Sequence, residues 1–157
     1  MKKIFSLLTA AFLILLASNV YAAAAWKDDA TVSKNFAQEV LDLVNIERRK
    51  ENLQPLKLAR DLNHYAQIRA KEITKKFSHT RPSGYSCFSV IPKPYRMVGE
   101  NIAAGQKSSR EVVEAWMNSP SHRENIMNPK FRELGVGYLY MPNLKYKHYW
   151  AQFFRLK

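Results

Sequence analysis

Residues 36–44 carry apolar side chains at helical spacing. They lie at positions i, i+4, i+7 and i+8 of one helix face: Phe36, Val40, Leu43 and Val44. Ser33 stands just before them and suits an N-cap. The pattern predicts an amphipathic helix that runs to about Lys50.

A second apolar stripe follows "ENLQPL", where Pro55 breaks the first helix. Its members are Leu58, Leu62, Tyr65, Ala66 and Ile73. The stripe predicts a second helix to about Lys76. Both helices have one apolar face, so each needs a surface to pack on.

Between Phe77 and Arg96 the helical pattern stops, because three prolines and Gly84 interrupt "FSHTRPSGYSCFSVIPKPYR". We expect a long irregular connection, and such loops in compact domains are often functional. A short helix is then predicted in "SSREVVEAWMNSP", opened by a capping box of Ser108 and Glu111 and stopped by Pro120. "SHRENIM" predicts one more helical turn before Pro129.

The last part of the chain changes to strand-like patterning. "LGVGYLYM" and "YWAQFFRLK" are rich in aromatic and β-branched residues and flank the turn-bearing "PNLKYKH". Helices followed by an antiparallel strand pair predict an α+β fold. The aromatic residues Trp116, Tyr138 and Trp150 fit core packing better than ligand stacking, and Gly135 and Gly137 suggest close approach of a neighbouring layer.

The N-terminus has the features of a signal peptide. Lys2 and Lys3 precede an uncharged apolar run from Ile4 to about Ala17, and Val20-Tyr21-Ala22 resembles a cleavage site. A transmembrane anchor is the alternative, but the run is shorter than the roughly 20 residues that span a bilayer. We therefore expect residues 1–22 to be a signal peptide, 23–33 a flexible arm and 34–157 one domain, exported to the periplasm or the cell exterior, with no transmembrane segment in the mature chain.

The net charge indicates which class of partner to expect, and the cysteine content shows whether disulfides can form. The net charge is +12, and +10 remains without Lys2 and Lys3, which favours an anionic envelope or lipid ligand outside the cytoplasm. Nucleic acid is not favoured, because the basic residues are mixed with acidic ones and no aromatic-rich motif accompanies them. Cys87 is the single cysteine, so no internal disulfide can form, and an unpaired thiol is most often buried. We expect the protein to be a monomer.

Four histidines limit the candidate chemistry. His79 and His122 lie outside the apolar stripes, whereas His64 and His148 suit a helix surface and a strand linker. Two imidazoles and Glu100 are the ligand types of a His2Glu metal site that leaves one position open for water. The spacing is too wide for a local metal motif, so unrelated surface residues, or an internal ion-pair cluster that ties three segments together, remain alternatives.

Four motifs carry a family resemblance: "FSHTRPSG", "GENIAAG", "EAWMNSPSHRENIMNPKFRELGVGY" and "YWAQFF". In this order, behind two amphipathic helices, the chain from about residue 36 to 157 resembles the CAP superfamily, also called SCP-like or cysteine-rich secretory, antigen 5 and pathogenesis-related 1, and most closely its cysteine-poor bacterial branch. The resemblance implies a three-layer α-β-α sandwich with a central antiparallel sheet and a broad cleft on one side.

The same resemblance implies which residues line that cleft. The motifs place His79, Glu100 and His122 at family positions, as ligands for a divalent metal such as Zn²⁺ or Mg²⁺. At the fourth position many eukaryotic members have a Glu, in a W-x-x-E run, but here Ser119 follows Trp116. A neutral hydroxyl removes one compensating charge or one partner that orients an imidazole, so we expect weaker metal binding. Substitutes for the missing acid are Glu124 and Glu114.

Three functions follow from these residues. The favoured one is a non-enzymatic extracellular or periplasmic module that binds a lipid, an envelope polymer or another anionic ligand. The alternative is a metal-assisted, peptidase-like hydrolase in which His79, Glu100 and His122 would be catalytic. A cysteine hydrolase that pairs Cys87 with His79 is the least favoured, because no cysteine-protease signature surrounds the thiol.

Overall fold

The computed structural model describes residues 35–157, and the predicted signal peptide (1–22) and arm (23–33) lie outside the described residues. A helix covers residues 35–50. The elements that follow are β1 (Lys57–Leu58), α2 (Arg60–Glu72), a 3₁₀ turn (Cys87–Val90), β2 (Met97–Ala104), α3 (Ser109–Met117), α4 (Pro120–Met127), β3 (Glu133–Tyr140) and β4 (His148–Leu156). None of the helices in this part of the chain is long and apolar enough to cross a bilayer.

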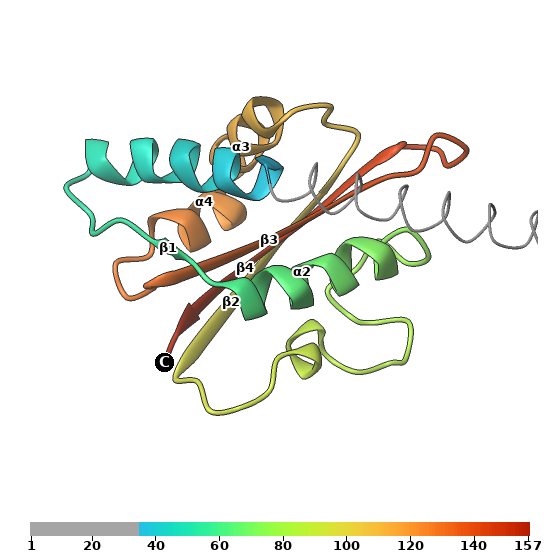
Figure 1. Cartoon of the computed structure of the whole chain (residues 1–157), viewed down its shortest axis with the longest axis horizontal. Coiled ribbons are helices and arrows are strands. Elements are labelled where there is room, and N and C mark those ends of the chain that lie inside the picture. The colour runs from blue at the N-terminus through green and yellow to red at the C-terminus, as the bar shows by residue number, and fades with distance from the viewer. Residues whose placement is uncertain (1–34) are drawn as a thin grey trace, which may run out of the picture. The chain divides into compact units, whose positions relative to one another are not determined.

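One four-stranded sheet forms the middle layer of the domain, in the order β1-β3-β4-β2. β4 is antiparallel to both β3 and β2, as predicted for the final strand pair. The two-residue β1 adds a short parallel edge beside β3, so the sheet is mixed and not purely antiparallel. Helix α2 covers one face, and the 35–50 helix, α3 and α4 cover the other (Figure 1), which gives the expected three-layer arrangement.

Two glycines of β3 determine how closely α2 packs on the sheet. A Cβ atom built on Gly135 would lie 2.3 Å from the main chain of Leu62, and one on Gly137 would lie 2.3 Å from the main chain of Ala66. Both distances are far below van der Waals contact, so the helix backbone rests directly on the strand. The predicted close approach at these glycines is confirmed.

The opposite face of the sheet holds the larger core. There the 35–50 helix, α3 and α4 contribute apolar side chains that pack on alternate residues of β3 and β4. Trp116, Tyr138 and Trp150 all belong to this cluster and are buried. Their predicted role as core residues is correct.

Several predicted boundaries were wrong by a few residues. Leu58, expected in the second helix, pairs in β1, and α2 begins at Arg60 and ends at Glu72. Pro120 does end the preceding helix, but it is also the first residue of α4, where its missing N–H costs no hydrogen bond. Ser108 caps α3 as predicted, by accepting a hydrogen bond from the Glu111 N–H.

Strand β2 forms the outer edge of the sheet, and side chains from the helices cover part of that edge. The indole Nε1 of Trp116 donates to the Ile102 carbonyl (3.4 Å), and the amide of Asn125 donates to the Glu100 carbonyl (3.2 Å). Successive residues of β2 point to opposite faces, so Glu100 faces the α2 side and Asn101 faces α4. This edge is where the candidate site lies.

Candidate functional site

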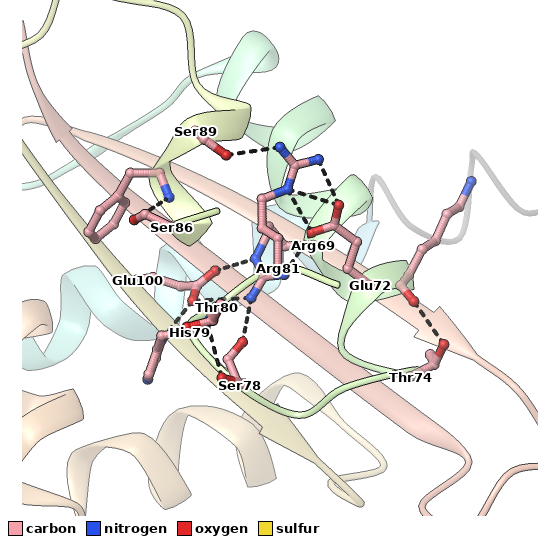
Figure 2. A network of polar contacts seen from close by, with 12 residues as sticks. Arg69, Glu72, Thr74, Ser78, His79, Thr80, Arg81, Ser86, Ser89 and Glu100 are labelled. Atoms are coloured by element: carbon pink, nitrogen blue, oxygen red, sulfur yellow. Dashed lines mark hydrogen bonds and ion pairs between the residues drawn. The ribbon is translucent and has the colours of Figure 1, made fainter. Parts of the chain in front are cut away.

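The carboxylate of Glu100 is the centre of a buried polar cluster on the α2 face (Figure 2). Its Oε1 lies 2.7 Å from Nδ1 of His79, and its Oε2 accepts a hydrogen bond of 2.7 Å from Nε of Arg69. Only 5% of Glu100 is exposed. Both oxygens of this carboxylate are therefore already in charge-assisted hydrogen bonds.

Arg69 connects this carboxylate to helix α2 and to the loop that follows it. The guanidinium is fully buried, and it also donates to Glu72 (2.7 Å) and to the Ser78 carbonyl (2.7 Å). Glu72 in turn accepts hydrogen bonds from Arg81 in the irregular connection. Figure 2 shows how this network joins α2, the loop and β2.

The neighbours of Glu100 keep it ionised despite its burial. Burial by itself raises the pKa of the carboxyl group, but hydrogen bonds from His79 and Arg69, and the positive charges of both, outweigh burial and lower the pKa below 4.5. A charged carboxylate accepts the proton of His79 Nδ1, so it fixes the imidazole with Nε2 on the outer side.

Acid is therefore expected to destabilise the protein through Glu100. A carboxyl group whose pKa is lower in the folded state contributes stability above its unfolded pKa, and loses it as the pH falls through the folded pKa. We expect the free energy of unfolding to drop more steeply below about pH 4.5 for the wild type than for Glu100→Gln. Urea titrations across this range measure the two slopes, with Glu124→Gln on exposed α4 as the matched control. Equal slopes for the wild type and Glu100→Gln would contradict this role.

The imidazole of His79 is well placed to reach solvent, since 59% of its side chain is exposed. It follows α2 on the irregular connection, and its position depends on the bond to Glu100 and on its carbonyl, which accepts the Cys87 N–H (2.9 Å). The predicted pairing of His79 with Glu100 is present in the structure.

His122 lies on α4 and is held by a different partner. Its Nδ1 is 2.8 Å from Oγ of Ser119, the residue at the position where the motif resemblance led us to expect a fourth acid. Burial, and then the charge of His79, lower the pKa of His122, which favours the neutral ring. Ser119 thus orients the imidazole without supplying a negative charge.

Asn101 fixes the backbone of His122 to the edge strand. Its Nδ2 donates to the His122 carbonyl (3.1 Å) and to Gln152 (3.0 Å), while its Oδ1 accepts from Asn125 (2.9 Å). Glu100 therefore binds the His79 ring on one face of the sheet, and Asn101 binds the His122 carbonyl on the other. The two histidines are attached to consecutive residues of β2.

Cys87 is buried beside Glu100 and is not a nucleophile in this state. One ligand atom each of His79, Cys87 and Glu100 lies within 4.8 Å of the others, and this is the one such group of potential metal ligands found in residues 35–157. Burial and the neighbouring charge of Glu100 raise the pKa of the thiol to about 12. The thiolate that a cysteine hydrolase needs is absent near neutral pH.

The matching family model connects this geometry to known proteins. Residues 41–154 match the CAP model, described as the cysteine-rich secretory protein family. The chain belongs to the CAP family. Within this CAP domain, Glu100 lies on β2, His122 on α4 and His79 on the irregular connection. Ser119 stands in place of the Glu of the W-x-x-E run, and its hydroxyl group contacts His122.

Relatives of this CAP domain occur in several bacteria. It is 41% identical over 109 residues to the uncharacterized protein YkwD of Bacillus subtilis, covering 66% of this chain and 42% of that protein. An extracellular protein of Bacillus anthracis with an SCP domain shares the fold with a TM-score of 0.70 at 29% identity, covering 80% of this chain and 42% of that one. An outer surface protein of Borrelia burgdorferi superposes with a TM-score of 0.67 at 22% identity, over 83% of this chain and 94% of that one. The chain thus spans less than half of the two Bacillus proteins.

The residue that the motifs did not reveal is Arg69. It lies seven positions after Leu62 and three after Ala66, in phase with the buried stripe of α2, and this phase was the available signal. The other two histidines lie outside the cluster: His64 is exposed on α2, and His148 bonds Tyr138 (2.8 Å). The suggested substitutes for the missing acid do not join it either: Glu124 is exposed, and Glu114 lines a hollow beside Leu43.

Proposed function

We propose that this CAP domain is an exported, non-enzymatic binding module in which His79 and His122 hold a divalent cation for an anionic envelope ligand. One observation carries the proposal. Each imidazole has its Nδ1 bonded to a side-chain oxygen, Glu100 for one and Ser119 for the other, while no group among residues 35–157 bonds either Nε2. This is how proteins orient a histidine that presents Nε2 to a metal.

The donor set fits a cation if Glu100 orients a ligand and does not itself bind the metal. Two atoms bound to one zinc ion at about 2.0–2.1 Å lie more than about 3 Å apart in tetrahedral geometry, whereas His79 Nδ1 and Glu100 Oε1 are 2.7 Å apart. That distance is a hydrogen bond. The expected ligand set of His79, Glu100 and His122 thus becomes two imidazoles with Glu100 behind one of them, and imidazole favours Zn²⁺ over Mg²⁺.

The bound cation would supply a positive charge to an anionic group of the ligand. The chain's own residues prepare for it: the lowered pKa of His122 keeps a lone pair available, and the Glu100 carboxylate stabilises positive charge near His79. Ser119 gives weaker support than an acid would, which is consistent with a module that binds its cation reversibly.

The export part of the proposal rests on the N-terminal pattern and on relatives whose names describe an extracellular protein and an outer surface protein, while the net charge of +12 supports an anionic ligand. The hydrolase alternative is less well supported, because a general base must accept a proton, and both oxygens of Glu100 already accept hydrogen bonds from Arg69 and His79.

Zinc binding by the untagged protein tests the proposal. We expect calorimetric titration to give one site, a raised melting temperature with zinc, and loss of both effects in His79→Ala and in His122→Ala. Ser119→Ala removes the Nδ1 partner of His122 and should weaken zinc binding by about 10- to 100-fold. It breaks no helix cap, since the Ser119 side chain makes no cap bond.

The control is His64→Ala, which removes an exposed imidazole from α2. It should bind zinc like the wild type. A wild type without a thermal shift at millimolar zinc, or a loss in His64→Ala equal to that in His79→Ala, would rule out the proposed cation site.

A further inference from the structure

A second surface gathers exposed apolar side chains at the end of the sheet where β3 turns into β4. Tyr140, Met141 and Tyr146 are 50%, 38% and 45% exposed, and Phe77 is 53% exposed. These are four of the six large apolar side chains that are exposed among residues 35–157. We call residues 140–147 the hairpin tip; Figure 1 shows it as the red-orange loop beyond the ends of β3 and β4.

The hairpin tip is preformed by its own main chain. Met141 and Lys147 are joined by an N–H to carbonyl bond (2.6 Å), and Leu144 donates to the Met141 carbonyl (3.0 Å). Leu144 points inward and packs with Ile73 and Tyr149 in the cluster below α2. The tip can therefore present its outer side chains without a large entropy cost for ordering the loop on binding.

Two lysines lie beside the exposed aromatic residues in the hairpin tip. The tip carries Lys145 and Lys147, and the ammonium group of Lys145 lies 5.1 Å from the centre of the Tyr146 ring. No acidic residue occurs between Glu133 and the C-terminus. Local charge on the tip is therefore positive without internal compensation.

Two other segments add lysines at the same end. Helix α2 runs alongside β3 toward the tip, as the contacts of Gly135 with Leu62 and of Gly137 with Ala66 show, so exposed Lys75, Lys76 and Phe77 follow it there. Lys107 lies near His148, whose pKa is lowered by burial and by that lysine. Of the acids close by, Glu72 is paired with Arg69 and Arg81. Glu111 accepts the Lys107 backbone N–H and keeps its negative charge, so the lysines at this end outnumber the unpaired acids.

We propose that the hairpin tip docks on a bilayer containing anionic phospholipids, with Tyr140, Met141 and Tyr146 at the headgroup level and the lysines against the phosphates. Tyrosine and lysine together are typical of interfacial anchors, because the rings tolerate a half-wet position and the long lysine stems reach the charged groups. A soluble anionic polymer would explain the lysines but not three exposed apolar side chains on a preformed loop.

This inference needs the export part of the proposed function but not its cation site, and its residues are different ones. The test therefore includes a chelator throughout, so that failure of zinc binding cannot affect it. Protein recovered from the exporting host is mixed with vesicles of phosphatidylcholine, alone or with phosphatidylglycerol, and binding is measured by co-sedimentation at low and high salt.

We expect binding only to the anionic vesicles, and weaker binding at high salt. One lysine near such a surface contributes a factor of about five, so Lys145→Gln/Lys147→Asn should bind about 30-fold more weakly. Asparagine suits position 147, where φ is +61°. Met141→Ser/Tyr146→Ser should lose roughly tenfold while keeping the salt dependence. Unchanged melting temperatures confirm that both variants fold.

The matched control is Lys57→Gln/Lys130→Gln, which removes the same charge from exposed positions near the β1 end of the sheet. An equal loss in the control would overturn the proposal in favour of a diffuse electrostatic attraction. Binding to soluble dextran sulfate without any vesicle binding would assign the tip to a polymer. Dimerisation at micromolar protein that Tyr146→Ser abolishes would assign it to a second copy of the chain. Either result would overturn the bilayer proposal.

Discussion

Replacing Arg69 by leucine is expected to destabilise the protein by about 3–5 kcal/mol, which is the usual effect of removing one partner of a buried ion pair. The guanidinium is fully buried and Glu100 is 5% exposed. Without Arg69, the carboxylate keeps its bond to His79 but loses its permanent positive partner, and must either remain charged in a poor environment or take up a proton. Urea denaturation of the wild type and Arg69→Leu at neutral pH measures the loss.

Two further variants separate the buried pair from general damage. Arg69→Leu/Glu100→Leu removes both charges and should recover most of the stability, because apolar residues of similar volume often replace a buried pair without cost. Arg81→Leu breaks the partly exposed bridge to Glu72, which keeps its bond to Arg69, and should therefore cost less than Arg69→Leu. A double variant as unstable as Arg69→Leu would show that packing, and not the unpaired charge, causes the loss.

Gly137→Ala is expected to cost about 3 kcal/mol, since the added methyl group would lie 2.3 Å from the main chain of Ala66. Main-chain atoms of a packed helix cannot rotate away, so α2 must move off the sheet as a unit. Thermal or urea unfolding measures the effect, and the near-ultraviolet circular dichroism spectrum reports the disturbed packing around Tyr138.

Gly84→Ala provides the control for this substitution. A Cβ there has nothing within 4 Å, although φ is +88°. The alanine should therefore cost only the backbone strain of a left-handed residue, about 1–2 kcal/mol. If Gly137→Ala were no more harmful than Gly84→Ala, the close contact between α2 and β3 would be looser than the structure shows.

Periodicity predicted the helices and the last two strands well, because each has one apolar face against a single layer. It did not predict β2 (Met97–Ala104). The reason is the pair Glu100 and Asn101: both are buried, on opposite faces, so the strand lacks the apolar and polar alternation of a half-buried strand. Their partners come from distant segments and cannot be read from the local sequence.

The burial of two arginines was also not predicted from the sequence. Arg48 and Arg69 stand in stretches where basic and acidic residues are mixed, which is typical of solvated helix faces, yet both are fully buried. Arg48 donates to the carbonyls of Ile126 (2.6 Å) and Asn128 (2.9 Å) and so joins the 35–50 helix to α4. Each arginine falls in phase with its apolar stripe, four residues after Val44 in one case, and this phase outweighs the general preference of arginine for the surface.

For the candidate site, one of the contacts expected from the sequence is present, while the role of these residues in metal binding stays a prediction. The motifs identified His79, Glu100, His122 and Ser119, and the structure joins the first pair directly. From the sequence alone, Glu100 is expected to be a metal ligand. The sequence does not show that Arg69 and His79 already form hydrogen bonds with its two oxygens. The contact of Ser119 with His122 Nδ1 joins two residues whose roles the sequence did not connect, so it is seen only in the folded structure.

The consecutive placement of Glu100 and Asn101 on β2 has a consequence for how this domain can change over time. One residue inserted or deleted within β2 before Glu100 would turn the two side chains to the opposite faces: a deletion would bring the Asn101 amide to Arg69, and an insertion would bring the carboxylate to Asn125 and Gln152. Both histidines would lose their supports in a single event. Length changes are thus barred from this strand, and the two imidazoles are expected to be inherited, or lost, together.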